Sequence, residues 1–260
     1  MSNADRGPWQ VARDVYRLTT GHGALRVNVY LVRADDAWAL VDTAWGSSAA
    51  VIRSAAERLF GRDARPAAIL LTHIHPDHSG AALELARAWD RPVSVHADEV
   101  PLASGGIVAE YANPLDRRVI APILRLMPAA RVEAQRVAAS LEPVVEALPA
   151  GGHVPALPGW RAVPTPGHTP GHVAFFREHD RVLLTGDAVL TVNPASLSGL
   201  LLDRHRLTGP PTMSTWRRAA ATASVSALAA LRPAVLASGH GSPMTGPGLG
   251  DALEGLAARL

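Results

Sequence analysis

Four side chains able to bind a metal ion lie within six residues of one another. They are His73, His75, Asp77 and His78, and they follow an apolar run over residues 67–71 that predicts a buried strand. Side chains alternate between the two faces of an extended backbone, so the first three are expected to point to the same side. Three imidazoles and a carboxylate suit zinc or a similar divalent ion. A loop that is merely rich in histidine is the alternative, but adjacent imidazoles repel one another once they are protonated.

The chain after this motif predicts a helix over residues 79–86. His78 would then lie where that helix begins. The partial positive charge of a helix N-terminus disfavours the imidazolium form. We therefore expect the helix to help keep His78 neutral, which is the form that binds a metal ion.

Polar residues of the same kind recur just past other predicted strands, each beside a glycine or in a turn. They are Asp42, His168, Asp187 and His240. Rigid strands that fix the geometry while loops carry the chemistry are a common way for an α/β protein to build a site. The sequence therefore predicts that these residues meet the motif at one edge of a sheet.

The donors divide into two sets that could surround a pair of ions. One ion could take His73, His75 and His168, and a second Asp77, His78 and His240, with Asp187 bridging the two. Two cations would lower the pKa of a shared water towards neutrality and would polarise an attacked carbonyl group. Such a mechanism requires no serine, cysteine or lysine nucleophile, and the chain has no cysteine and no lysine.

Some nearby residues are expected to support the site rather than to bind an ion. Asp42 is expected to orient a ligand histidine, because carboxylates behind metal-bound imidazoles commonly do so. His172 is predicted to be structural or to orient a ligand. Trp45 could line the mouth of a pocket or pack in the core. No role is assigned to the other histidines, which are His22, His96, His153, His179 and His205.

Composition narrows the classes of protein. At 260 residues and 48% apolar content the chain can bury a full core, and we predict one domain over residues 1–260. The net charge is only +2 with scattered arginines, so we expect no nucleic-acid partner. No run approaches the roughly 20 apolar residues of a spanning helix, and no signal-like start is seen, so we expect no membrane partner and a cytoplasmic location. Without cysteine, any metal must be held by nitrogen and oxygen.

The elements that position these residues alternate between strand and helix. Strands are predicted at 14–18, 25–33, 37–41, 67–71, 92–95, 160–164, 173–177, 181–185 and 234–237, and helices at 51–60, 79–86, 216–231 and 249–260. Residues 98–148 interrupt this alternation and predict a helical insertion with an apolar face. The insertion could cap a pocket and select substrates, or it could pack on the core or on a second copy of the chain.

Taken in order along the chain, these motifs resemble those of the metallo-β-lactamase superfamily. The motifs are His73-x-His75-x-Asp77-His78, the His168 loop, Gly186-Asp187 and Gly239-His240-Gly241. The resemblance implies an α/β fold in the form of a four-layer αββα sandwich, with a dinuclear site at one edge of the sheets. Residues 165–172 and 239–244 look most like the glyoxalase-II-like branch, which includes thioesterases and lactonases.

Several positions depart from known members of that superfamily. Gly241-Ser242 stands where glyoxalase II has a Glu-Tyr pair, which argues against glutathione thioesters as substrates. Leu190 stands where acyl-homoserine lactonases have a tyrosine, which weakens the resemblance to that group. The absence of cysteine excludes β-lactamases with a cysteine ligand, and His75 does not fit the flavodiiron proteins, which carry glutamate there.

The resulting prediction is a hydrolase that cleaves a small ester, thioester or lactone by metal-bound hydroxide. Asp77 would act as both ligand and proton acceptor, the substrate would be a small molecule, and the cofactors would be two divalent ions, zinc first and iron or manganese as alternatives. An oxidoreductase is the main alternative, because the motifs also resemble those of persulfide dioxygenases, which bind one iron. A nuclease related to RNase Z and a metal-binding protein without catalysis are further alternatives. Assembly into a homo-oligomer is left open.

Overall fold

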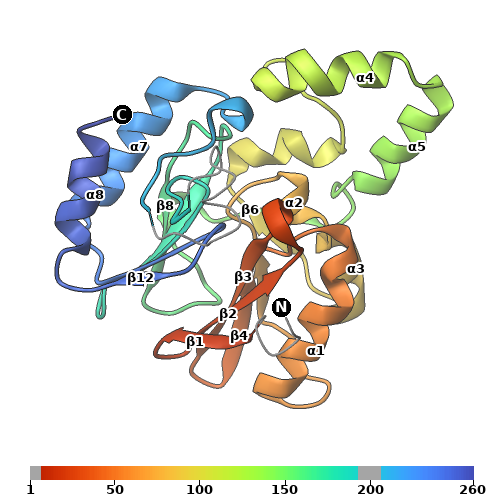
Figure 1. Ribbon diagram of the computed structural model, residues 1–260. Helices are drawn as coiled ribbons and strands as arrows, with labels where there is room; N and C mark the ends of the chain where they lie inside the picture. The colour runs from red at the N-terminus through yellow and green to blue at the C-terminus, as the bar shows by residue number, and fades with distance from the viewer. Residues whose placement is uncertain (1–6, 193–205) are drawn as a thin grey trace.

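Two β-sheets pack face to face in this computed structural model, which describes residues 7–192 and 206–260 (Figure 1). In those ranges the first sheet has the order β1-β2-β3-β4-β5-β6-β7, with bounds Trp9–Ala12, Val15–Thr20, Val27–Ala34, Ala37–Val41, Ala68–Leu70, Val93–Val95 and Val145–Ala147. The second sheet has the order β12-β11-β10-β9-β8, with bounds Met244–Thr245, Val235–Ser238, Val182–Gly186, Val173–Arg177 and Trp160–Pro164.

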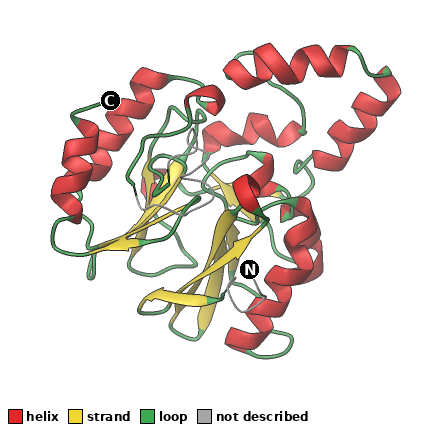
Figure 2. Cartoon of the chain, in the orientation of Figure 1, coloured by secondary structure: helices red, strands yellow, loops and turns green. Residues whose placement is uncertain are grey.

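Helices cover the outer face of each sheet (Figure 2). The α-helices of the described residues are α1 Ala49–Phe60, α2 Pro76–Ser79, α3 Ala82–Trp89, α4 Ala121–Arg125, α5 Ala129–Ala139, α7 Arg218–Ala230 and α8 Leu249–Ala257. Short 3₁₀ segments lie at η2 Gly23–Leu25, η3 Gly46–Ser48, η4 Ala97–Ser104, η6 Ala150–Gly152 and η7 Thr212–Ser214, and η5 Asp116–Ile120 is a π-helix. Among the described helices none is both long and apolar enough to cross a bilayer.

Three apolar layers hold the sheets and helices together. Alternate residues of β3 show the division, because Val29 and Leu31 pack towards α1 and α3 whereas Tyr30 and Val32 pack between the two sheets. A third cluster, which includes Val225 of α7 and Leu253 of α8, fills the space behind the second sheet. The four-layer αββα sandwich predicted from the sequence is therefore confirmed.

The two sheets meet at the edge where several strands end. Parallel pairing of β4 with β5 and of β10 with β11 brings the carboxyl ends of these strands to that edge. Backbone hydrogen bonds join the segments there: the Asn28 N–H donates to the Gly239 carbonyl (2.8 Å) and the Val173 N–H donates to the Thr72 carbonyl (2.9 Å). The polar residues that follow the strands are thus held on a rigid frame.

Some elements differ from the sequence prediction. The strands β1 and β12 were not predicted, because they are short and gain their pairing only from β2 and β11. The helix predicted at 79–86 is two helices, α2 and α3. His78 therefore lies inside a four-residue helix, and it does not begin a longer one.

The region predicted as a helical insertion, residues 98–148, is helical only in part. It runs through η4, η5, α4 and α5, but it ends in β7, which pairs in parallel with β6 and extends the first sheet. A three-residue strand is too short to show a period of its own, which is why the sequence pattern missed it. In Figure 1 α4 and α5 stand apart from the sandwich, on the side where α2 lies.

Candidate metal centre

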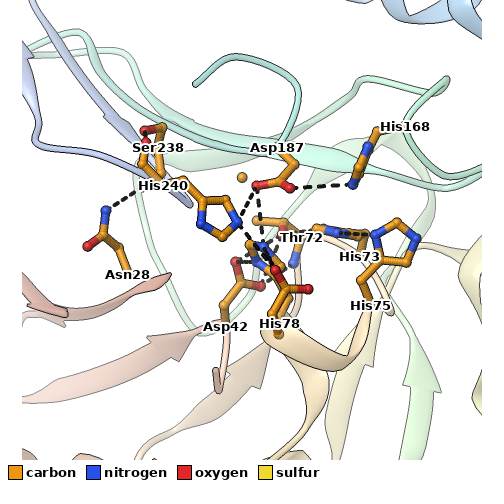
Figure 3. A network of polar contacts seen from close by, with 12 residues as sticks. Asn28, Asp42, Thr72, His73, His75, His78, His168, Asp187, Ser238 and His240 are labelled. Carbon is orange, nitrogen blue, oxygen red and sulfur yellow. Dashed lines mark hydrogen bonds and ion pairs between the residues drawn. The ribbon is translucent and has the colours of Figure 1, made fainter. Parts of the chain in front are cut away.

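The seven predicted ligands converge at the edge where the two sheets meet, and Figure 3 labels all of them except Asp77. His73 and His75 follow β5, and Asp77 and His78 belong to α2. The other three come from the second half of the chain: His168 from the loop between β8 and β9, Asp187 from the end of β10, and His240 from the end of β11. Each sheet thus contributes part of one site.

Asp187 lies between two sets of imidazoles. Its Oδ2 is 3.4 Å from Nε2 of His168. Its Oδ1 is 3.3 Å from Nε2 of His78 and 3.5 Å from Nε2 of His240. The two oxygens of one carboxylate therefore face different sets of ligands, as Figure 3 shows.

The remaining donors complete these two sets. Nε2 of His73 and Nδ1 of His75 are 3.1 Å apart, on the side of His168. Oδ2 of Asp77 is 3.3 Å from Nε2 of His240 and 3.9 Å from Nε2 of His78. Three groups of donors have ligand atoms all within 4.8 Å of one another: His73 with His75 and His168, His73 with His78 and Asp187, and Asp77 with His78 and His240.

Three buried polar atoms at this centre form no hydrogen bond within residues 7–192 and 206–260. They are Nε2 of His78, Nε2 of His168 and Oδ1 of Asp187. Buried polar groups nearly always have a partner. Divalent cations held by the two sets of donors would satisfy these atoms at the usual distance of about 2.0–2.2 Å, so the donors present fit metal ions.

The other ring nitrogen of most of these histidines is held by a separate partner. Nδ1 of His73 is 3.0 Å from the Thr72 hydroxyl, and Nδ1 of His240 is 2.7 Å from the Arg26 carbonyl oxygen. Nδ1 of His168 is 3.4 Å from the Thr215 hydroxyl. Such contacts fix the tautomer and turn Nε2 towards the centre, as is common for metal-binding imidazoles.

Asp42 is nearly fully buried and orients both His78 and the chain before the motif. Its Oδ2 lies 2.9 Å from Nδ1 of His78, and its Oδ1 accepts the Thr72 N–H at 2.8 Å. Asp42 does not reach the centre itself. It lies behind His78, the position expected for a residue that orients a ligand.

His172 lies behind Asp187. Its Nε2 accepts the backbone N–H of Asp187 at 3.1 Å, so this nitrogen carries no proton. Its Nδ1 can then donate to the Thr165 hydroxyl at 2.7 Å. Burial and the neighbouring imidazoles lower the pKa of His172 to about 3, although Asp187 acts in the opposite direction. His172 is therefore a neutral residue that holds Asp187 in place.

Carboxylates, and not a helix N-terminus, determine the protonation of His78. Burial lowers its pKa, but Asp187, Asp42 and Asp77 outweigh burial and raise the pKa well above its usual range. The prediction that a helix N-terminus keeps His78 neutral is thus wrong, because α2 has only four residues and three carboxylates surround the ring. A proton shared between His78 and these carboxylates must leave before the ring can bind an ion.

His73 and His168 behave in the opposite way. Burial lowers the pKa of each ring well below its usual range, and the imidazoles around them act in the same direction. Both rings are therefore neutral at physiological pH. Their donor nitrogens are ready to bind a cation without losing a proton.

Protein freed of metal with a chelator is expected to lose stability as the pH falls from about 6.5 towards 3. His73, His168 and His172 have lowered pKa values in the folded state, so the unfolded chain binds more protons in this window. His78 and His240 have raised pKa values and are protonated in both states below about 6.5, so they add no slope there. Urea unfolding at several pH values measures the effect.

A matched variant controls for general effects of acid on this protein. His179→Gln removes an exposed histidine far from the centre and should leave the slope unchanged, whereas His172→Gln should reduce it. A free energy of unfolding that stays constant between pH 6.5 and pH 4 would contradict the neutral state assigned to the buried rings.

Gly239 allows the segments that carry Asp187, His78 and His240 to approach one another closely. A Cβ atom placed on Gly239 would lie 2.6 Å from Oδ1 of Asp187 and 2.6 Å from Cε1 of His78. No larger residue fits there without moving a ligand. The Gly239-His240-Gly241 motif thus leaves room for the centre as well as supplying a donor.

Glu99 is a buried residue of the site that the sequence analysis missed. It lies in η4, it is 0% exposed, and burial raises the pKa of its carboxyl group. Its Oε2 accepts the N–H of Ile74 at 2.7 Å, and its Oε1 accepts the N–H of Gly171 at 2.8 Å. Ile74 lies between His73 and His75, so one carboxylate ties the motif to the His168 loop. No local pattern marks this role, because both contacts are distant in sequence.

Glu99→Gln is expected to weaken metal binding about 10–100-fold, the usual cost of losing a residue behind the ligands. The amide has one acceptor oxygen, and its NH₂ group would face an N–H donor. Competition with a coloured chelator measures the affinity. Glu133→Gln is the matched control, because Glu133 is exposed and pairs with Arg136 on the outside of α5. Equal affinity of the Glu99 variant and the parent protein would rule out this role.

Asn28 and Tyr30 of β3 are both buried where the two sheets meet. The side-chain amide of Asn28 donates to the carbonyl oxygens of Ser238 (3.0 Å) and Gly241 (2.7 Å). The Tyr30 hydroxyl donates to the Ser238 carbonyl oxygen at 2.7 Å. These contacts fix the loop that carries His240. An asparagine flanked by two valines was the available signal in the sequence.

A cavity of about 1000 Å³ opens above the ligands. Its floor includes His75, Asp77, His168, Asp187 and His240. Trp45 lines it too, and the same side chain packs against the core cluster of the first sheet, so both alternatives for this residue hold. Its indole N–H donates to the Leu25 carbonyl oxygen at 2.9 Å. A molecule that enters the cavity would therefore reach the donor atoms.

The sequence profile of the metallo-beta-lactamase superfamily matches residues 22–240, and the chain belongs to this superfamily. It is similar to the probable metallo-hydrolase YflN of Bacillus subtilis, with 37% identity over 97% of this chain and 93% of YflN. Among solved structures it is similar to the metallo-beta-lactamase family protein TTHA1429 of Thermus thermophilus, with 25% identity over 96% of this chain and 79% of that one and a TM-score of 0.64. It is also similar to TTHA1623 in a di-iron-bound form, with 26% identity over 94% of this chain and 97% of that one and a TM-score of 0.58.

Proposed function

We propose that this protein is a hydrolase of the glyoxalase-II-like kind that cleaves a small ester, thioester or lactone at a dinuclear site. One observation carries the proposal. Oδ1 of Asp187 faces His78 and His240, whereas Oδ2 faces His168, so a single carboxylate can join two sets of ligands. A site for one ion would not need an acidic residue with donors on both sides.

The donors favour two divalent ions, with zinc first and iron or manganese as alternatives. Neutral imidazole suits zinc and iron, and carboxylate oxygen is accepted by all three metals. Two relatives support this assignment: YflN carries the description of a probable metallo-hydrolase, and TTHA1623 was solved in a di-iron-bound form. When bound, such ions lower the pKa of a shared water and polarise the carbonyl group of a substrate.

Asp77 is the residue placed to move the proton. Burial raises its pKa, but His78 and His240 outweigh burial and hold the pKa well below its usual range, so the carboxylate is ionised at neutral pH. It also lines the cavity, where a substrate would lie. An ionised carboxylate within reach of the attacking water can take its proton.

The reaction that follows is a hydrolysis. The oxygen of a water forms a bond to the carbonyl carbon, and Asp77 takes a proton from that water. The bond from the carbonyl carbon to the leaving oxygen or sulfur then breaks, and its electron pair stays with the leaving atom. The proton on Asp77 passes to the leaving group. An ester or thioester then gives an acid and an alcohol or thiol, and a lactone gives a single hydroxy acid.

Isotope labelling of the product tests this proposal. Protein loaded with zinc or manganese is incubated in ¹⁸O-labelled water with an aryl ester, an acyl thioester and a lactone. We expect one ¹⁸O atom in the acid product of at least one substrate, and no product after treatment with a chelator. The oxidoreductase alternative predicts a different result: iron-loaded protein would take oxygen from labelled O₂ with a persulfide. Labelling from O₂ together with no hydrolysis of any ester class would refute the proposal.

A further inference from the structure

The cavity above the metal ligands is large for a site that acts only on a small acyl group. Its volume of about 1000 Å³ lies at the upper end of the roughly 300–1000 Å³ usual for small-molecule sites. The ligand residues His75, Asp77 and His240 belong to the same cavity as residues of the region 102–141. A substrate whose carbonyl reaches the ligands therefore has space to extend under that region.

The wall supplied by the region 102–141 is mainly apolar. Its apolar side chains come from η4, from the loop before η5 and from α4, and include Leu102, Ile107, Val108, Tyr111, Leu115 and Leu124. The polar residues on this wall are Asn113, Asp116 and Gln135. Asn113 and Asp116 are engaged with each other's backbone. The Asn113 N–H donates to Oδ2 of Asp116 (3.1 Å), and the Asp116 N–H donates to Oδ1 of Asn113 (2.9 Å). They therefore stabilise the start of η5.

The opposite wall, from β2 and β3, has a different character. It carries the polar side chains of Arg17, Thr19 and Asn28, together with Ala24 and Leu25 from the segment between the two strands. Nε of Arg17 is buried and forms no hydrogen bond within the part of the chain that the structure describes. The cavity thus has a mainly apolar wall from the region 102–141 and a more polar wall from β2 and β3. This asymmetry gives a bound molecule a preferred direction.

We propose that the substrate of the proposed hydrolase carries a long apolar acyl chain, of about six carbons or more, which lies along the wall formed by Leu102, Leu115 and Leu124. The inference rests on the proposed function, because it places the carbonyl carbon at the ligand residues. Apolar side chains that face a water-filled cavity gain free energy when a hydrocarbon chain covers them. The wall from β2 and β3 then faces the leaving group.

A series of acyl substrates with one leaving group tests the proposal. Metal-loaded protein is assayed with straight-chain esters or thioesters from two to twelve carbons. We expect kcat/KM to rise about fourfold for each added CH₂ until the wall is covered, since a buried CH₂ contributes about 0.8 kcal/mol. A profile that is flat, or that favours two carbons, would overturn the inference and leave the proposed function intact. Hydrolysis of none of them, and of no lactone, by protein with both ions bound would instead defeat the proposed function.

Two variants in one short segment test where the acyl chain of the substrate lies. Leu124→Asn changes a lining residue of α4, whereas Leu126→Asn changes a residue that is 88% exposed and outside the cavity. The first should lower kcat/KM for an eight-carbon substrate at least about tenfold and leave a two-carbon substrate nearly unchanged. The second should change neither. An equal loss for both chain lengths would contradict the placement.

Inhibition of the unchanged protein gives a readout that does not depend on any variant folding correctly. Straight-chain carboxylates should inhibit more strongly as they lengthen, with the same dependence on chain length as the substrates. A second copy of the chain could cover the apolar wall instead. Two results together would show that a second copy covers the wall and would overturn the inference. The protein would form dimers that Leu124→Asn abolishes, and inhibition would not depend on the length of the carboxylate.

Discussion

Substitution of Asp77 by alanine is expected to abolish measurable turnover while the protein stays folded. The change removes a ligand-type oxygen that lies 3.3 Å from Nε2 of His240, and it also removes the ionised carboxylate placed to take a proton. Loss of a general base alone usually lowers the rate about 10²–10⁴-fold, and loss of a metal ligand adds to this. Steady-state kinetics on the best substrate of the ester, thioester and lactone screen measures the effect.

Asp77→Asn separates the two roles of this residue. The amide keeps an oxygen that can face a metal ion but cannot accept a proton at neutral pH. We expect this variant to retain metal more fully than Asp77→Ala and still to lose most of its turnover. Circular dichroism should show a folded protein in both cases, because Asp77 is partly exposed at the cavity and no core residue depends on it. Full activity in either variant would exclude Asp77 from the mechanism.

Substitution of Asp187 by alanine is expected to disturb both sets of ligands at once. Its carboxylate lies within 3.5 Å of Nε2 atoms of His78, His168 and His240. Residues behind the ligands already contribute about 10–100-fold in metal affinity, so a carboxylate shared by two ions should contribute more than about 100-fold. Elemental analysis of the purified variant should therefore find at most one ion per chain, and turnover should fall with the loss of metal.

The control for Asp187 is an acidic residue that binds nothing at the centre. Asp251→Ala removes an exposed carboxylate that pairs with Arg232, and it should leave metal content and turnover unchanged. Asp187→Asn keeps the shape of the side chain and tests whether charge is needed. If Asp187→Ala retained two ions per chain, the carboxylate could not be the group that joins the two sets.

Residues close together in sequence could be predicted most fully. His73, His75, Asp77 and His78 share one short segment, and their type and spacing already indicate metal binding. Strands such as β3 could also be predicted from their apolar residues, whereas the αββα sandwich was implied by the resemblance of the ordered motifs. The resemblance of ordered motifs added the expectation that His168, Asp187 and His240 join the segment.

Contacts between distant segments could not be predicted from local patterns. Glu99 has no sequence neighbour that reveals its two backbone partners, 25 and 72 residues away. The strand β7 has only three residues, and its pairing with β6 defines it. The protonation of His78 was wrongly predicted for a related reason. The three carboxylates around its ring come from three different segments, and their combined effect exceeds that of a short helix.

The position of the side chains of the region 102–141 relative to the ligands could not be predicted from the sequence either. Their apolar character was visible in the sequence, with a cap, the core or a second copy of the chain as alternative destinations. The structure places Leu115 and Leu124 on the wall of the same cavity that holds His75 and Asp77. Proximity of this kind depends on the tertiary fold, because the two segments are far apart along the chain. A role in selecting substrates stays a prediction.

Metal content is the most direct test of a dinuclear hydrolase. The protein should be purified without added metal, and the identity and number of ions per chain should be measured by elemental analysis. The account predicts close to two divalent ions per chain, with zinc first and manganese or iron as alternatives. One iron per chain would contradict the dinuclear site and favour the oxidoreductase alternative, and no metal at all, even after incubation with each ion, would contradict the assignment of the centre.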